Sequence, residues 1–166
     1  MAFTITPEAL YFGAPTTLQF NSVDVGATID APKVSFEVVN YVPEFQGAKG
    51  PVKGTVITTR VVPSVEFTVN ELTSEKIAWA MPGSSGSGTI TWTPGRIADA
   101  AYMDLVLVGE GLDGRTITFT LYNAMSSESQ ELDFSNSAVS GLKMKFTGHY
   151  DPATPTVAPF QIVISA

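Results

Sequence analysis

The sequence predicts a mainly β protein, built as an antiparallel β-sandwich or barrel with one short α-helix and a long loop between two strands. Segments in which apolar and polar residues alternate recur along the chain, and this period is typical of strands with one buried face. Clusters of Gly, Pro, Asn and Ser separate these segments, as expected for turns. Only one stretch combines helix start and stop signals. The 166 residues are expected to form a single domain, residues 1–166.

The amino-terminal part of the chain contains only short apolar segments. Phe3–Thr6 and Leu10–Phe12 are punctuated by Pro7 and Gly13, and Thr16–Phe20 is predicted to be a strand. The pattern fixes no strand register before residue 33.

The central part of the chain carries the clearest strand signals. Lys33–Val38 alternates between polar and apolar residues, and the turn-rich segment Val42–Lys53 predicts a long connection. Thr55–Val62 is rich in β-branched residues and predicts a second strand. Pro63 is expected to end that strand, and Val65–Val69 is predicted to form the next one.

A short helix is predicted immediately after these strands. The hydroxyl of Thr73 can accept a hydrogen bond from an unpaired N–H of the first turn. Pro82 is followed by glycine and ends the helix, which is therefore predicted over Ser74–Met81. Ile77 and Met81 are four residues apart, so both are expected to face the core.

The carboxyl-terminal half repeats the alternating pattern after a glycine- and serine-rich connection at residues 83–88. One helical turn is predicted at Arg96–Ala100. Five segments are predicted to be strands: Thr89–Thr93, Tyr102–Val108, Thr116–Tyr122, Leu142–Thr147 and Phe160–Ser165.

The order of the central segments resembles a known protein family. The dipeptide GA precedes the strand KVSFEV, the loop PEFQGAKGPVKGT follows, and PSVEFTVNELTSEKIAWAM completes the match. In order and spacing these segments resemble the major tail tube protein of long, non-contractile-tailed bacteriophages. The resemblance covers Val23 to Met81 clearly and the final strand-rich region loosely.

This resemblance implies a structural virion protein rather than an enzyme. Members of the family form hexameric rings that stack into a hollow tail tube, are made in the host cytoplasm, and meet tail-tip and tail-terminator proteins. Strands of neighbouring subunits join around the lumen, and genomic DNA passes through it without specific binding. Members are also similar in fold to the ring-forming tube protein of type VI secretion systems.

The resemblance also assigns roles to particular residues of the chain. The long loop is expected to reach the next ring, with Phe45 as an apolar anchor. The charged side chains expected beside it at this contact are Glu44, Lys49 and Lys53. Glu37 and Glu66 lie on the polar faces of their strands and are expected to give the lumen a band of negative charge. Without the resemblance, an ordinary solvated sheet face explains these two residues equally well.

Composition narrows the possible functions. The hydrophobic fraction of 44% and charged fraction of 15% favour a folded domain over disorder. The chain has no cysteine, so disulfides, thiolate metal sites and cysteine nucleophiles are excluded. A net charge of −7 disfavours attraction to nucleic-acid phosphates. No signal peptide or membrane-spanning segment is expected from the sequence.

Several apparent active-site motifs have a simpler explanation. Gly109–Gly114 matches a dinucleotide-binding fingerprint in its letters, but a strand rather than a helix is predicted to follow, so we interpret it as a hairpin turn. Gly83–Thr89 imitates a phosphate loop without its lysine. His149 is the only histidine, and no serine lies in a nucleophile elbow. We therefore expect no enzyme, no cofactor and no metal.

Two other classes of function stay open. A soluble β-sandwich binding module, either carbohydrate-binding or capsid-decorating, is the main alternative, because Trp79 and Trp92 are residue types that stack on sugars. A hydrolase with paired carboxylates ranks third, since such pairs need not be close in sequence. A binding module is expected to work as a compact monomer, whereas a tube protein needs open edges that copies of itself fill.

Overall fold

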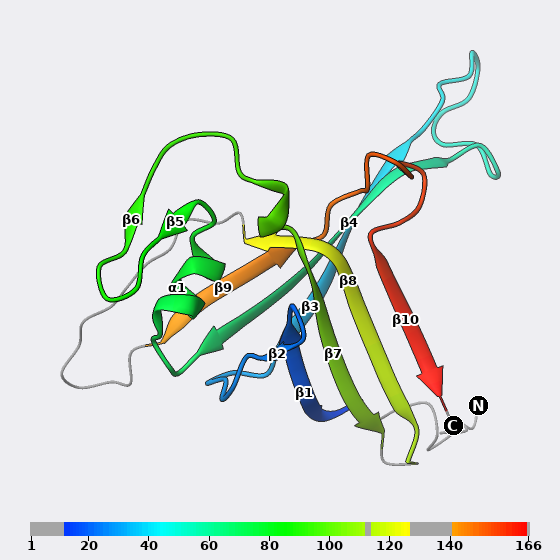
Figure 1. Cartoon of the computed structure of the whole chain (residues 1–166). Helices are drawn as coiled ribbons and strands as arrows, with labels where there is room; N and C mark the ends of the chain where they lie inside the picture. Colours follow the sequence, from blue (N-terminus) through cyan, green and yellow to red (C-terminus); the bar gives the residue numbers. More distant parts are fainter. Residues whose placement is uncertain (1–11, 112–113, 127–140, 166) are drawn as a thin grey trace.

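The computed structural model describes residues 12–111, 114–126 and 141–165. Figure 1 shows their arrangement, in which strands dominate and a single α-helix packs beside them. A 3-10 helix spans Asp99–Ala101. The remaining elements are β1 (Phe12–Phe20), β2 (Val23–Asp24), β3 (Lys33–Tyr41), β4 (Ile57–Val69), α1 (Ser74–Ala80), β5 (Ser84–Ser85), β6 (Thr91–Trp92), β7 (Met103–Gly111), β8 (Thr116–Ser126), β9 (Leu142–Thr147) and β10 (Phe160–Ser165).

Eight of the described strands form one antiparallel sheet in the order β2-β1-β7-β8-β9-β4-β3, with β10 paired to β8 outside this path. The strand β8 changes partners along its length. Its first part, Thr116–Leu121, pairs with β10, whereas Met125 and Ser126 pair with β9. The sheet therefore divides into two layers that share β8: the β10 layer (β2, β1, β7, β8 and β10) and the β3 layer (β8, β9, β4 and β3). The predicted fold class is confirmed.

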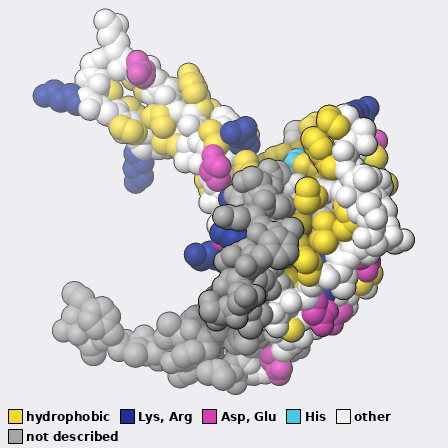
Figure 2. Space-filling model, turned by 90° about the vertical axis from the view of Figure 1, so that its left-hand side faces the viewer, with side chains coloured by type: hydrophobic (Ala, Val, Ile, Leu, Met, Phe, Trp, Pro, Cys, Tyr) yellow, Lys and Arg dark blue, Asp and Glu magenta, His cyan; other side chains and the backbone are white. Residues whose placement is uncertain are grey.

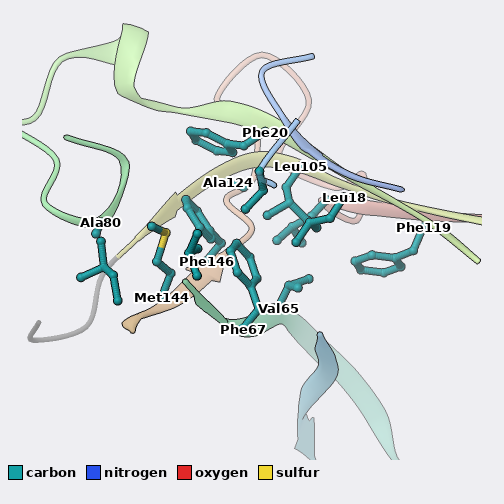
Figure 3. Packing of buried hydrophobic residues seen from close by; sticks show 14 residues of the cluster. Leu18, Phe20, Val65, Phe67, Ala80, Leu105, Phe119, Ala124, Met144 and Phe146 are labelled. Carbon is teal, nitrogen blue, oxygen red and sulfur yellow. The ribbon is translucent and has the colours of Figure 1, made fainter. Parts of the chain in front are cut away.

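Buried apolar side chains from both layers form a single cluster (Figure 3). Phe146 of β9 lies within it and is fully buried. Its ring centroid is 4.7 Å from that of Phe20 in β1 and 5.6 Å from that of Phe67 in β4. Leu105 and Leu121 of the β10 layer are likewise fully buried in the cluster. Aromatic packing between the layers thus holds them together.

Several predicted elements have the bounds that the sequence indicates. The strands β9 and β10 coincide with the predicted segments Leu142–Thr147 and Phe160–Ser165. In β9 the apolar positions Leu142, Met144 and Phe146 are all buried, as alternation requires. The segments Phe3–Thr6 and Leu10–Tyr11 lie outside the described residues.

The predicted helix is confirmed, but the prediction that Met81 faces the core is wrong. The N–H of Lys76 donates to Thr73 Oγ1 at 3.2 Å, which is the predicted cap. Ile77 packs against the core cluster. Met81 is 37% exposed because the helix already ends at Ala80 and Met81 is the capping residue, with φ of −122°. Ala80 occupies the buried position instead.

Pro63 does not end a strand, contrary to the prediction. The strand β4 runs through it, and Pro63 pairs with Phe36 of β3. The carbonyl of Pro63 accepts a hydrogen bond from Gly148 N at 3.0 Å, on the side of β9. A residue's N–H and C=O point to the same side of a strand. The missing N–H therefore points past the end of β9, where the ladder needs no donor.

The aromatic cluster predicts a large cost for its loss. Replacing Phe146 by Ala should lower the free energy of unfolding by about 3–5 kcal/mol, because a buried ring leaves a cavity. Phe45→Ala removes the same atoms from an exposed site and should cost less than about 0.5 kcal/mol. Urea denaturation of both variants measures the difference. Equal losses in the two variants would contradict the packing described.

Candidate functional site

The hairpin formed by β3 and β4 extends well beyond the rest of the sheet (Figure 1). The strand β9 supports β4 only from Ser64 onward. We call residues 37–62, the unsupported parts of both strands with their connecting loop, the hairpin arm. At its base, Tyr150 Oη accepts from Val61 N at 3.1 Å and donates to Val61 O at 3.0 Å. Beyond this anchor the hairpin arm is a two-stranded ribbon, a structure that is marginally stable when isolated.

The hairpin arm exposes an unusual amount of apolar surface. Figure 2 shows hydrophobic side chains along the projecting part of the molecule. Seven large apolar residues of the hairpin arm are between 38% and 57% exposed: Val38, Tyr41, Val42, Phe45, Val52, Val56 and Ile57. Large apolar side chains exposed in such number along one segment are typical of an interaction site.

The structure places the four predicted loop contacts together on the tip of the hairpin arm. Glu44, Phe45, Lys49 and Lys53 are all exposed. The tip has local order, because Ala48 N donates to Phe45 O at 3.1 Å and Thr55 Oγ1 donates to Val52 O at 2.7 Å. Whether these side chains meet another ring stays a prediction.

Glu37 and Glu66 lie on one face of the β3 layer. In β3 and β4, Glu37 stands opposite Val62 and Glu66 stands opposite Lys33, and directly opposed residues point to the same side. We call this side, which faces away from the core cluster, the outer face. Glu66 also stands opposite Lys145 of β9.

Lysines control the ionisation of Glu66. Its Oε1 lies 2.7 Å from Lys143 Nζ. The hydrogen bond from Lys143 is the largest influence and lowers the pKa of the Glu66 carboxyl. Desolvation opposes it, and the positive charges of Lys143, Lys145 and Lys33 each add a smaller lowering.

The outer face is consequently not a purely acidic surface. Its strands carry four cationic side chains against the two carboxylates: Lys33, Arg60, Lys143 and Lys145. The sequence analysis did not predict these cations beside the two glutamates, because nothing in the sequence shows that β9 lies beside β4. The alternation of Lys143 and Lys145 with buried residues was the available signal.

An apolar cleft of about 680 Å³ opens between β3 and β10. We call it the cleft. Its residues come from both layers: Pro15, Ala31, Pro32, Val34, Phe36, Leu107, Gly109, Ile117, Phe119, Ile162 and Ile164. At one end it is closed by Phe36, whose ring centroid is 4.9 Å from that of Phe160 and 6.0 Å from that of Phe119. The sequence did not reveal the cleft, because pairing between distant strands creates it.

The remaining candidates for chemistry have structural explanations. His149 Nδ1 lies 3.0 Å from Asn123 O, and the imidazole packs edge-to-face with the Tyr102 ring, with centroids 5.1 Å apart. Gly109 and Gly111 end β7, and β8 follows at Thr116, so the fingerprint-like segment is a hairpin as predicted. Within the described ranges, no three potential metal-ligating side chains cluster.

Comparison with models of known protein families and with curated proteins finds no match for this chain. Among the helices that the structure describes, none combines the length and the apolar character needed to span a bilayer.

The lysine environment of Glu66 predicts a pH-dependent contribution to stability. The pKa of Glu66 is lower in the folded chain, so its contribution is present above the unfolded pKa and is lost as pH falls through the folded pKa. Because this pair is partly exposed, Glu66→Gln should cost less than about 1 kcal/mol at pH 7. Urea titrations from pH 7 to pH 3 should show the two proteins converging in acid. A difference that is constant over this range would contradict the pairing.

Proposed function

We propose that the chain is a structural subunit that assembles with copies of itself, as a ring-forming component of a phage tail tube. The observation that carries this proposal is the hairpin arm. Its two-stranded ribbon exposes seven large apolar side chains that the chain's own core does not cover. A second subunit packed against the hairpin arm would bury this surface and stiffen the ribbon.

The edges of the sheet support the same proposal. Among the described strands, β3 and β10 each have a neighbour on one side only. Exposed edges offer unpaired N–H and C=O groups to another chain, and monomeric proteins usually protect them. A subunit whose edges join those of its neighbours uses this property for assembly.

The sequence resemblance supplies the finer part of the proposal. It adds hexameric rings stacked into a tube in the virion, a lumen through which genomic DNA passes, and contacts with tail-tip and tail-terminator proteins. No catalytic role is part of the proposal. The binding-module alternative was based on two tryptophans, of which Trp79 packs on Phe20 with ring centroids 5.3 Å apart. Trp92 is 56% exposed, its Nε1 donates to Pro82 O at 3.3 Å, and it does not line the cleft.

The charges of the outer face refine the proposed role of Glu37 and Glu66. If this face lines the channel, four cationic side chains accompany the two carboxylates. Lysine and arginine on a channel wall attract the phosphates of passing DNA. Glu66 then offsets the lysines beside it, and loss of both glutamates would make the wall more strongly basic.

Assembly through the hairpin arm is tested with Phe45→Ser. The variant should fold with wild-type stability, because Phe45 is 49% exposed, and should fail to form long tubes. Val157→Ser is the control, since Val157 is 60% exposed and is not part of the hairpin arm, and it should assemble normally. Electron microscopy and sedimentation at rising protein concentration measure assembly. Wild-type tubes from Phe45→Ser would show that the hairpin arm is not a stacking element.

The channel wall is tested by reversing both glutamates, Glu37→Lys with Glu66→Lys. Assembled tubes of this variant should retain DNA, and the retention should weaken as salt is raised. Glu75→Lys with Glu110→Lys changes the net charge equally on α1 and β7 and should leave DNA retention unchanged. A filter-binding assay at several salt concentrations measures how much DNA the tubes of each variant retain. Equal behaviour of the two double variants would remove the outer face from the lumen.

A further inference from the structure

The cleft leaves core-like side chains uncovered. On β10, Ile162 is 51% exposed and Ile164 is 63% exposed, and on β3, Phe36 is 42% exposed. Ile162 stands opposite Phe119 of β8, which is buried. Large apolar side chains that are exposed beside a buried neighbour indicate that a covering element belongs there.

The cleft and the hairpin arm lie at opposite ends of β3. Phe36 packs on Phe160 at one end of the cleft, and the hairpin arm begins at the next residue, Glu37. From Phe36 the cleft follows β3 back to Ala31 and follows β10 forward to Ile164, and we call this second end the far end. Because β3 pairs with β4 along its whole length, the hairpin arm cannot fold back into the cleft of its own chain.

We propose that the hairpin arm of a second copy of this chain enters the cleft at its far end, with the apolar side chains of its tip against the cleft walls. The inference rests on the proposed function and adds to it the surface that receives the hairpin arm. Both surfaces keep large apolar side chains exposed on the single chain. Contact between them would remove these side chains from water, which is the main driving force of protein association.

The dimensions of the two surfaces agree. Along β3, the four residue steps from Pro32 to Phe36 give the cleft a length of about 13 Å. The five further steps from Phe36 to Tyr41 make the strand part of the hairpin arm about 17 Å long, and the loop extends it. The cleft volume of about 680 Å³ is within the range of roughly 300–1,000 Å³ that encloses a whole small ligand, so it admits several side chains of the tip.

The charges of the two surfaces are complementary. The tip carries Glu44, Lys49 and Lys53, a net charge of +1. At the far end of the cleft, Asp30 precedes Ala31 and Glu110 follows Gly109, and both carboxylates are exposed. The base nearest to them in the sequence that is not on the outer face is Arg115, so this end keeps a net negative charge. The lysines of an entering tip therefore meet carboxylates at the rim of the cleft.

The same asymmetry holds for the whole chain. The hairpin arm contains two acidic and three basic residues, a net charge of +1, and the chain has a net charge of −7, so the remaining residues carry −7 − 1 = −8. A second copy is thus attracted to the rest of the chain through its hairpin arm.

The proposed contact is heterologous, because the hairpin arm of one copy meets the cleft of the next. Copies joined in this way continue head to tail instead of closing as a symmetric pair. The cleft lies between β3 and β10, whose free edges are the ones already proposed for assembly. One arrangement of copies therefore uses the hairpin arm, the cleft and the two edges together.

The first test is a disulfide between copies of the full chain, which has no cysteine of its own. The tip receives Gln46→Cys, which leaves Phe45 in place, and the cleft receives Ala31→Cys, or Ile164→Cys for its other wall. Under mild oxidation each of these pairs should produce a ladder of dimers, trimers and larger species on a non-reducing gel, because a head-to-tail contact repeats. The three single variants should stay mostly monomeric on the same gel.

The matched control is Gln46→Cys with Ala153→Cys. Ala153 is exposed like Ala31 but precedes β10 and lies outside both the cleft and the hairpin arm, so this pair should give no ladder. A ladder of equal extent with Ala153, or no ladder with either cleft position, would overturn the inference. Sedimentation of the same samples separates the two proposals: assemblies without the disulfide ladder leave the proposed function standing, whereas the absence of any assembly removes both.

The second test places a charge in the cleft. Ile164→Asp should raise the protein concentration needed for assembly at least tenfold, because an unpaired carboxylate would have to be buried under the entering hairpin arm. Val163→Asp is the control: Val163 is 43% exposed and its side chain points to the opposite side of β10, so assembly should change little. Urea midpoints near that of the wild type would show that both variants fold. Equal assembly of the two variants, retained or lost, would overturn the inference.

Discussion

The architecture depends on the place where β8 changes partners. At Asn123, between the part paired with β10 and the part paired with β9, the backbone adopts φ of 48°. Asparagine tolerates this left-handed conformation better than most residues. Hydrogen bonds hold the bend: His149 Nδ1 lies 3.0 Å from Asn123 O, and Asn123 Nδ2 donates to His149 O at 3.3 Å. Asp104 Oδ1 accepts from Asn123 N at 3.2 Å. The only histidine of the chain is therefore part of a structural joint.

The division of the sheet at this bend in β8 determines which strand edges and apolar surfaces are exposed. The β10 layer and the β3 layer meet through the aromatic cluster around Phe146, but their outer strands diverge and leave the cleft between them. Because β9 ends at Thr147, none of the described strands accompanies the hairpin arm as a third strand. One topological feature thus produces both the free edges and the exposed apolar ribbon on which the proposed assembly depends.

Local sequence signals predicted the secondary structure correctly where interactions between near neighbours determine it. The alternation in Leu142–Thr147 and the cap at Thr73 gave correct elements, because burial of alternate side chains and satisfaction of helix N–H groups need only near neighbours. The prediction that Pro63 ends a strand was wrong, because a strand can contain proline where no partner strand needs its N–H, and here that depends on where β9 ends. The exposed position of the loop around Phe45 follows from its turn-rich composition, and its contacts stay a prediction. The cleft and the cations beside Glu66 arise from pairings between distant segments that no local pattern encodes.

The pairing of β4 with β9 also bears on how a channel wall would treat DNA. It places Lys143 and Lys145 beside Glu66, so the charge of the outer face is set by the sheet register and not by the composition of the whole chain. The net charge of −7 is then a poor guide to this face. Close ion pairs such as Glu66–Lys143, at 2.7 Å, satisfy their charges locally, and a polyanion beyond about 8–10 Å is screened from them by salt. Four cationic side chains against two carboxylates leave this face with a surplus of positive charge, so a channel wall made of it would attract the phosphates of passing DNA at low salt and release them as salt is raised.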